Sequence, residues 1–301
     1  MKKKYVFIGD TDSINIELIC KSHHKIKHHV KYIIICNLRD LKKYMNRISS
    51  NLKINEIVDP INFYNYKINY LNVFDIEHTH KNKCDNLLKQ IKISNYLASK
   101  TKFDLITMPV NKSVFKKRVN FTGMTEYLGK INKKKTIMLM HGEQFSIIPL
   151  TTHINLSSIN KSLKKDKLIS KLDNILTQIN KKIYDLKIKK IKMLCYNPHC
   201  SENKTIGSED HLIKKCILHF KKKIIGPISA DSAFNLISPK TLYLSMYHDQ
   251  ALIPFKILNK KSINLTLGLE FRRISPAHGT AVDIKFSNMA NTTSYIECMK
   301  F

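Results

Sequence analysis

Residues 32–36 read Tyr-Ile-Ile-Ile-Cys, an uninterrupted apolar run rich in β-branched side chains. A run of this length and composition is typical of a strand that is buried on both faces of a parallel sheet. Similar short runs, which we interpret as further strands, occupy residues 4–8, 104–107, 136–140, 191–196 and 241–246.

Helical patterns lie between these runs. We expect one helix near residues 12–21. A longer one is indicated by Leu168, Leu172, Ile175 and Ile179, whose spacing places all four on one stripe. Alternating strands and helices predict an α/β protein with a mostly parallel sheet, and chemistry in such sheets gathers beyond the carboxyl ends of the strands.

Length and composition exclude several classes of protein. A chain of 301 residues is long enough for two packed domains or one large α/β unit, and 43% apolar residues exclude a disordered tail. The apolar stretch at residues 5–8 is too short for a signal peptide, and no apolar run is long enough for a membrane span. Seven Cys without a C-x-x-C pair indicate reduced thiols. We therefore expect a soluble cytoplasmic protein that does not bind membranes.

The charge of the chain is strongly positive, because 52 basic residues outnumber 23 acidic ones and leave +29. Nucleic-acid binding is one interpretation of such a charge. However, only five of the basic residues are Arg, and the 47 Lys are spread along the whole chain. Recognition of bases and phosphates favours the Arg fork. We therefore expect a solvated lysine-rich surface that attracts anionic substrates, and no nucleic-acid partner.

Three histidines follow the ends of predicted strands. His153 comes after residues 147–152, His199 lies in Asn-Pro-His, and His248 lies in Met-Tyr-His-Asp-Gln. Each alone is more simply explained as a surface histidine. Together, three imidazoles at different strand ends favour a site for one divalent cation that keeps positions open for substrate.

Two further clusters suggest anion binding. Gly and Arg are rare in this chain, yet Gly268, Gly279 and two Arg lie within twelve residues. Either Arg272 or Arg273, beside Lys256 and Asn264, would form a clamp for a phosphate or a carboxylate, although an exposed basic loop is the alternative. In the second cluster, Lys112 follows a strand end and Met124-Thr125-Glu126 begins a helix. Thr125 would serve there either as a substrate contact or as an N-cap.

Five segments in order carry a family resemblance. They are Asn-Pro-His at 197–199 with Gly207 and Glu209, Gly226-Pro227 with Ala-Asp-Ser at 230–232, Met-Tyr-His-Asp-Gln at 246–250, Asn-Leu-Thr-Leu-Gly-Leu at 264–269 and His-Gly-Thr-Ala at 278–281. Together they resemble the 4-hydroxythreonine-4-phosphate dehydrogenases of vitamin B6 biosynthesis, within the wider isocitrate and isopropylmalate dehydrogenase-like group. The resemblance runs from the Gly9-Asp10 turn to residue 301 and is most specific over residues 197–283.

The resemblance implies two α/β domains with mostly parallel sheets and an active-site cleft between them. The first would comprise residues 1–129 plus 285–301, and the second, residues 130–284, would carry the metal ligands and the interface of a homodimer. The implied metal ligands are His153, His199 and His248, contributed across that interface. The implied substrate contacts are Met124, Thr125, Lys256, Asn264 and Arg273, and the implied cofactor contacts are His278, Gly279, Thr280 and Asp283. Supporting roles fall to Asp231, Asp249 and Lys112 by their position in the motifs.

The implied reaction is the oxidation of 4-phosphohydroxy-L-threonine by NAD or NADP. The β-keto acid formed would lose carbon dioxide to give 3-amino-2-oxopropyl phosphate, assisted by one zinc, magnesium or cobalt ion per site. Two alternatives remain: the same fold acting on another phosphorylated four-carbon acid, and a decayed paralogue that binds nucleic acid. A steep loss of binding with salt would mark the latter.

The chain departs from the family pattern at four places. The family's N-terminal Gly-Asp-Pro-Ala-Gly-Ile-Gly-Pro-Glu reads Gly-Asp-Thr-Asp-Ser-Ile-Asn-Ile-Glu at 9–17. Met124 replaces a substrate-contacting His, and Ala277 replaces an Asp. The glycine-rich stretch after Asp283 has become Lys-Phe-Ser-Asn at 285–288. These changes bear on cofactor and substrate affinity, whereas the metal triad and the anion clamp are intact. We therefore expect a working enzyme.

Overall fold

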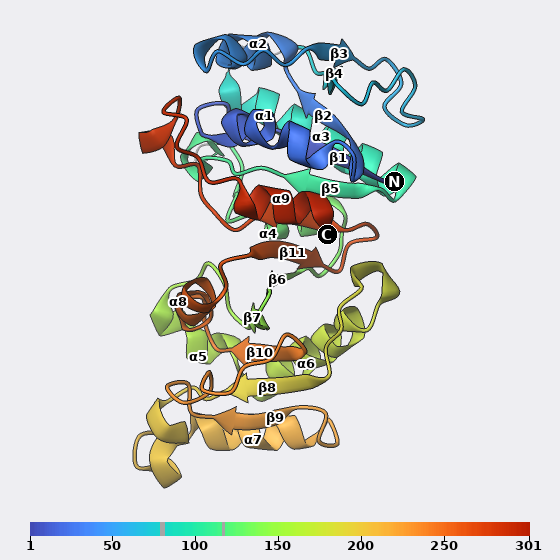
Figure 1. The fold of residues 1–301 in the computed structure, drawn as a ribbon. Helices are drawn as coiled ribbons and strands as arrows, with labels where there is room; N and C mark the ends of the chain where they lie inside the picture. Colours follow the sequence, from blue (N-terminus) through green and yellow to red (C-terminus); the bar gives the residue numbers. More distant parts are fainter. Residues whose placement is uncertain (79–81, 116–117) are drawn as a thin grey trace. The chain divides into compact units, whose positions relative to one another are not determined.

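The computed structural model describes residues 1–78, 82–115 and 118–301, and the chain divides into two compact units (Figure 1). Unit 1 comprises Met1–Lys134, Ile263–Leu265 and Leu269–Phe301, and unit 2 comprises Lys135–Ser262 and Thr266–Gly268. Strand β11 (Ser262–Leu267) contributes residues to both units.

Unit 1 contains a parallel sheet whose strands follow the order β3-β4-β2-β1-β5-β12. In chain order these strands are β1 (Lys2–Phe7), β2 (Val30–Cys36), β3 (Ile54–Glu56), β4 (Leu71–Asp75), β5 (Asp104–Thr107) and β12 (Arg273–Pro276). The strands predicted at 4–8, 32–36 and 104–107 are confirmed. Residues 32–36 are buried throughout, as expected of an inner strand with both faces covered. The sequence did not reveal β3, β4 and β12, which are only three to five residues long.

Helices cover this sheet. They are α1 (Asn15–Ile26), α2 (Leu38–Arg47), α3 (Lys83–Thr101), α4 (Met124–Ile131) and α9 (Thr293–Lys300), with short 3-10 turns η1 (Lys112–Phe115) and η5 (Val282–Ile284). Helix α1 packs against α2 and α9, whereas α3 packs against β1 and β5. The apolar core beneath α3 and α4 includes Tyr5, Phe7, Phe115 and Leu128.

Unit 2 contains strands in the order β6-β7-β10-β8-β9, in which only the β6–β7 pair is antiparallel. In chain order they are β6 (Ile137–Gly142), β7 (Ser146–Pro149), β8 (Lys190–Leu194), β9 (Ile225–Ile228) and β10 (Thr241–Ser245). The strands predicted at 136–140, 191–196 and 241–246 are confirmed with ends shifted by one or two residues. The expected α/β class with mostly parallel strands is thereby confirmed.

The helical elements of unit 2 are α5 (Ile159–Ser162), α6 (Lys165–Ile179), α7 (Glu209–Leu218) and α8 (His248–Leu258), with 3-10 turns η2 (Leu156–Ser158), η3 (Lys182–Tyr184) and η4 (Pro198–Lys204). In α6 the four residues of the predicted apolar stripe are all buried. Helix α6 packs against α7, and α8 packs against β7 and β10. These contacts fix α8, which begins at His248, beside the carboxyl end of β10.

Local caps explain where several helices begin. Asn37 accepts a hydrogen bond from Asp40 N at the start of α2, and Asn82 accepts one from Asp85 N at the start of α3. The N-cap of α4 is Gly123, whose backbone is extended. The N-cap interpretation of Thr125 is therefore wrong, because Thr125 already lies within the first helical turn.

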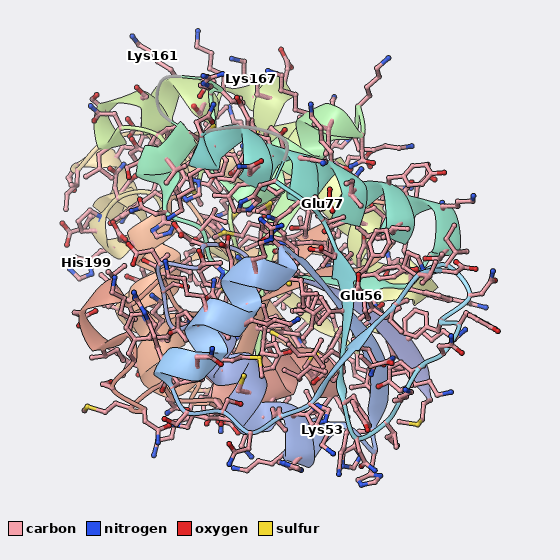
Figure 2. All side chains as sticks on the ribbon, turned by 90° about the horizontal axis from the view of Figure 1, so that it is seen from above. Lys53, Glu56, Glu77, Lys161, Lys167 and His199 are labelled. Atoms are coloured by element: carbon pink, nitrogen blue, oxygen red, sulfur yellow. The ribbon has the colours of Figure 1, made fainter. Side chains whose placement is uncertain are left out.

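The lysines and the cysteines can be compared with what the sequence predicts for the surface and for the thiols. Lys161 and Lys167 project outward from unit 2 and Lys53 from unit 1 (Figure 2), and all three are exposed. All seven cysteines are free thiols, and six of them are buried. Across residues 1–78, 82–115 and 118–301, no helix is both long and apolar enough to cross a membrane.

Candidate active site

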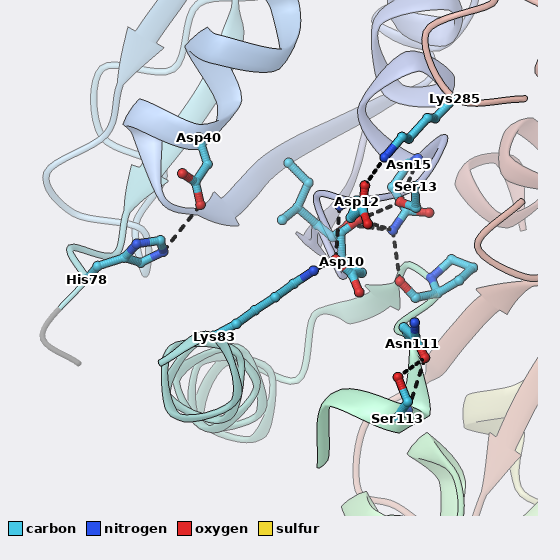
Figure 3. Close-up of polar contacts among 12 residues, drawn as sticks. Asp10, Asp12, Ser13, Asn15, Asp40, His78, Lys83, Asn111, Ser113 and Lys285 are labelled. Atoms are coloured by element: carbon cyan, nitrogen blue, oxygen red, sulfur yellow. Dashed lines mark hydrogen bonds and ion pairs between the residues drawn. The ribbon is translucent and has the colours of Figure 1, made fainter. Parts of the chain in front are cut away.

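The turn between β1 and α1 is held by a group of polar contacts (Figure 3). Gly9 has φ +74°, and a Cβ there would lie 2.4 Å from the carbonyl oxygen of Pro109, so only glycine fits. Asn15 Nδ2 donates to the carbonyl oxygens of Ile8 at 3.0 Å, Asp10 at 3.2 Å and Pro109 at 2.8 Å. The family pattern has glycine at position 15. Here the buried side-chain amide of Asn15 connects the turn to the residues just after β5.

The carboxylate of Asp10 adds further bonds to this turn. It accepts from Asp12 N at 2.9 Å and lies 2.5 Å from Lys83 Nζ at the start of α3. The turn therefore keeps a defined shape although it has lost the later glycines and prolines of the family pattern.

The segment predicted to bind the cofactor is anchored to this turn. Ile14 N donates to the carbonyl oxygen of Thr280 at 3.2 Å, and Lys285 forms an ion pair with Asp12. The ring of Phe286 packs against Tyr44 with 4.5 Å between centroids. The structure thus brings Thr280 and residues 285–286 to the carboxyl end of β1.

His278 and its neighbours in this segment differ in exposure. His278 Nδ1 lies 2.8 Å from the carbonyl oxygen of Gly279, and its buried Nε2 has no hydrogen-bond partner among the described residues. Burial lowers the pKa of His278, although the Gly279 carbonyl partly offsets this. Gly279 and Asp283 are exposed. The segment therefore presents one neutral imidazole, that of His278, and an exposed backbone at Gly279 and Asp283.

Arg273 is buried beside Thr125 in unit 1. Its Nε donates to Thr107 Oγ1 at 2.7 Å and its Nη1 to Thr125 Oγ1 at 3.4 Å. Burial lowers the pKa of Arg273 to about 10, so the guanidinium stays charged at neutral pH. The structure therefore brings two of the predicted substrate contacts together and fixes the fork of one of them.

The remaining predicted substrate-binding and supporting residues differ in how deeply they are buried. Met124 belongs to the apolar cluster with Phe115 and Leu128, so its thioether is packed in the core. Asn264 on β11 has a buried Oδ1 without a hydrogen-bond partner among the described residues. Lys256 is exposed on α8, and Lys112 is exposed on η1.

Two of the three predicted metal ligands are neighbours in unit 2. The imidazole centroids of His153 and His248 lie 5.7 Å apart, a separation at which two rings can share one cation. His248 Nδ1 lies 3.0 Å from Asp249 Oδ1, which leaves Nε2 as the outward nitrogen. Asp249 thus contacts the imidazole that it was expected to support.

His199 lies in a different environment, at the surface of unit 2 (Figure 2). Its imidazole is near Asp231, whose pKa is lowered mainly by a hydrogen bond with Ser229 and further by the charge of His199. Six consecutive residues from His199 to Lys204 have positive φ, the left-handed region. Among the described residues, no three His, Cys, Asp or Glu side chains are grouped closely enough to hold a metal ion.

Sequence reasoning missed the residues that hold these side chains. Asp210 is buried and accepts hydrogen bonds on both sides of His199, and Thr107 accepts from Arg273. Both are ordinary polar residues in the sequence, without a distinctive spacing. Only the register of α7 against the loop after β8, and of β5 against β12, brings them to their partners.

Comparison with known proteins agrees with the motifs. A family model described as "Pyridoxal phosphate biosynthetic protein PdxA" matches residues 25–301. A 4-hydroxythreonine-4-phosphate dehydrogenase from Sulfurihydrogenibium sp. is 31% identical over 314 aligned positions, covering 100% of this chain and 97% of the relative. One from Aquifex aeolicus is 32% identical, covering 99% and 97%.

Solved structures share the fold. That of a 4-hydroxythreonine-4-phosphate dehydrogenase from Klebsiella pneumoniae has a TM-score of 0.81 at 22% identity, covering 100% of this chain and 97% of the other. That of a terephthalate 1,2-cis-dihydrodiol dehydrogenase from Burkholderia xenovorans has a TM-score of 0.62 at 17% identity, covering 99% and 97%. With the family model matching most of the chain and relatives above 30% identity along its whole length, the chain belongs to the PdxA family of pyridoxal phosphate biosynthetic proteins.

Proposed function

We propose that this chain is a 4-hydroxythreonine-4-phosphate dehydrogenase. It oxidises 4-phosphohydroxy-L-threonine with NAD or NADP, and the β-keto acid decarboxylates to 3-amino-2-oxopropyl phosphate. The observation that carries the proposal is full-length identity above 30% to enzymes of that name. The buried pair of Arg273 and Thr125, which suits an anionic group, supports it.

Two of the three implied cation ligands, and the segment implied to bind the cofactor, suit those groups. His153 and His248 supply two imidazoles at a separation suited to one ion, and we propose His199 as the third ligand. The unpartnered Nε2 of His278 and the exposed backbone at Gly279 suit a polar cofactor. When bound, the nicotinamide accepts a hydride and a zinc, magnesium or cobalt ion lowers the pKa of the substrate hydroxyl.

In this proposal the side chains of the protein bind and orient the substrate. Arg273, Lys256 and Asn264 hold the phosphate, so that its binding energy positions the hydroxyl. Thr125 supplies a hydroxyl beside the Arg273 fork. Because Met124 is packed in the apolar cluster, the thioether contributes shape and no hydrogen bond.

We further propose that the protein works as a homodimer in the cytoplasm. Ile253 is 61% exposed and Ile257 is 72% exposed on α8, the helix that also carries His248 and Lys256. These side chains lie one turn apart and form an apolar stripe of the kind that a partner subunit covers. Sedimentation of the wild type and of Ile257→Asp tests the dimer, because a charge at an apolar interface would dissociate it.

The function is tested by absorbance at the reduced-nicotinamide band. Purified protein is mixed with 4-phosphohydroxy-L-threonine, NAD or NADP and a divalent cation, and a chelated sample is the control. We expect reduction that depends on the cation. A folded protein that reduces the cofactor only with another phosphorylated four-carbon acid would contradict the substrate, and one that reduces none would contradict the activity.

His248→Ala should abolish turnover while the protein stays folded, because it removes one of the two adjacent imidazoles. Turnover is measured by the same assay and folding by circular dichroism. His219→Ala is the matched control, since His219 is an exposed residue of unit 2 at the end of α7. Near-normal turnover of His248→Ala would show that the assigned ligand set is wrong.

A further inference from the structure

Asp210, the second residue of α7, is buried at 2% exposure and directs its carboxylate at the loop after β8. Its Oδ1 accepts from Tyr196 N at 2.6 Å, and its Oδ2 accepts from Asn197 N at 3.0 Å and from Ser201 Oγ at 2.7 Å. These three donors lie on both sides of His199. A single carboxylate therefore clamps the loop that presents this imidazole.

The neighbouring Glu209 reinforces the clamp. Its Oε2 accepts from Asn197 Nδ2 at 2.8 Å, and the same amide nitrogen lies 3.0 Å from Ser201 Oγ. Asn197, Ser201, Glu209 and Asp210 therefore form one connected network. In such a network each bond restricts the geometry of the next, so that the loop has few alternative arrangements.

The loop needs such a restraint because its backbone is strained. His199 has φ 48°, Cys200 φ 56° and Ser201 φ 66°, and each non-glycine residue in this region costs roughly 1–2 kcal/mol. Without bonds at its two ends, the loop would relax toward right-handed or extended backbone and turn the imidazole elsewhere. An aspartate in the first turn of a helix commonly interacts with the helix dipole, but here the carboxylate accepts three hydrogen bonds from the loop.

We propose that Asp210 is a positioning residue, which fixes the direction of His199 and thereby the affinity of the protein for its divalent cation. This inference rests on the proposed role of His199 as a metal ligand. Asp210 acts through the backbone and through Ser201, without touching the ion. Residues that hydrogen-bond directly to a metal ligand typically contribute about 10-fold to 100-fold to metal affinity, and we expect an effect of that order from Asp210, which acts on the loop that carries the ligand.

The test measures binding of Co²⁺ alone to the full-length protein, by titration calorimetry and by the visible absorbance of the bound ion. Asp210→Asn keeps the shape of the side chain but replaces one acceptor oxygen with an NH₂ group, so not all three bonds can form. We expect Co²⁺ to bind about 10-fold to 100-fold more weakly, with a changed absorbance spectrum and an unchanged circular dichroism spectrum.

Two further variants keep the test decisive. Ser201→Ala removes one of the three bonds and leaves the buried carboxylate, so it should fold and weaken Co²⁺ binding less than Asp210→Asn does. Asp173→Asn removes the same charge from an exposed position on α6 and should bind Co²⁺ as the wild type does. This control separates positioning from the loss of one negative charge.

The outcomes distinguish the inference from the function on which it rests. If the wild type binds Co²⁺ and Asp210→Asn binds it equally well with the same spectrum, the positioning role is overturned while the metal site stands. If the wild type binds no Co²⁺, the proposed metal site is wrong and Asp210 has no ion to affect. If Asp210→Asn weakens binding no more than Asp173→Asn, the effect is one of net charge, which also overturns the inference.

Discussion

At the scale of single residues, two adjacent arginines point to different partners. Arg272 donates to Asp104 from Nε at 2.8 Å and from Nη2 at 2.7 Å, and Lys4 Nζ lies 3.2 Å from the same carboxylate. Arg273, one residue later, points to the other side and donates to the hydroxyls of Thr107 and Thr125. Arg272 is therefore held by a bidentate ion pair with Asp104, whereas the hydrogen bonds of Arg273 include those to the hydroxyls of Thr107 and Thr125.

Thr107→Val should weaken substrate binding without much change in kcat. The hydroxyl of Thr107 accepts from Arg273 Nε at 2.7 Å, and its loss leaves that part of a buried guanidinium poorly satisfied, which costs about 1–3 kcal/mol. Steady-state kinetics should show a raised KM for the phosphorylated substrate, and urea unfolding a lower stability. Thr107→Ser keeps the hydroxyl and should behave as the wild type does. A KM unchanged in Thr107→Val would show that Thr107 does not orient the fork.

At the scale of elements, the segment from His199 to Lys204 has a left-handed backbone conformation that its amino-acid sequence does not predict. Its six residues include no glycine, although only glycine adopts this conformation without cost. The segment ends at Lys204, with φ 79° and an exposed side chain. The strain is therefore held by the bonds of Glu209 and Asp210 at the start of α7.

Lys204→Gly should stabilise the protein by about 0.5–1 kcal/mol, because glycine relieves the left-handed backbone at a position whose side chain is exposed. Lys214→Gly is the matched control, since Lys214 is exposed in the middle of α7. There the same substitution should destabilise by about 1 kcal/mol. Equilibrium unfolding in urea measures both. Destabilisation by Lys204→Gly would contradict the left-handed conformation of the segment.

The same elements show what the sequence could predict. Residues 32–36 and the stripe from Leu168 to Ile179 carry strong periodic patterns, and both form the predicted element. Of the strands that were missed, β3 is short and β9 lacks a buried pattern, whereas β11 is six residues long and was interpreted only as part of a binding motif. For the candidate site, the order of the motifs suggested the histidines and the arginine, which stay predictions. The partners that hold them depend on tertiary register, as Asp210 does with Tyr196, so no local pattern identifies them.

At the scale of the whole molecule, the charge of +29 is the property that most separates this chain from an average enzyme. Exposed lysines occur in both units, as at Lys53 in unit 1 and Lys161 in unit 2 (Figure 2). Among the described residues of unit 1, five lysines lie over aromatic rings at 5.1–5.9 Å from the centroid: Lys3, Lys31, Lys67, Lys100 and Lys285. Lysines beside aromatic rings also occur in grooves that bind single-stranded nucleic acid, so the choice between such a groove and a solvated surface is made by measuring binding.

Such a surface makes stability depend on salt. The folded state concentrates the positive charges, so their mutual repulsion should lower its stability at low ionic strength. Raising NaCl from about 0.02 M to about 0.3 M shortens the screening length to below about 10 Å and should raise Tm by a few degrees. Thermal unfolding followed by circular dichroism measures this, and sucrose at matched osmolality controls for effects of the solute other than screening.

A single-stranded RNA added at low salt separates charge repulsion from a specific basic site. If the lysines act only through their summed field, the RNA should bind weakly, without saturating at one stoichiometry, and binding should vanish near 0.3 M NaCl as released counterions cease to favour it. A Tm that does not change with NaCl would mean that the lysines lie too far apart to repel one another. Saturable RNA binding that persists at high salt would instead place a specific basic surface on this chain and contradict the expectation of a merely solvated one.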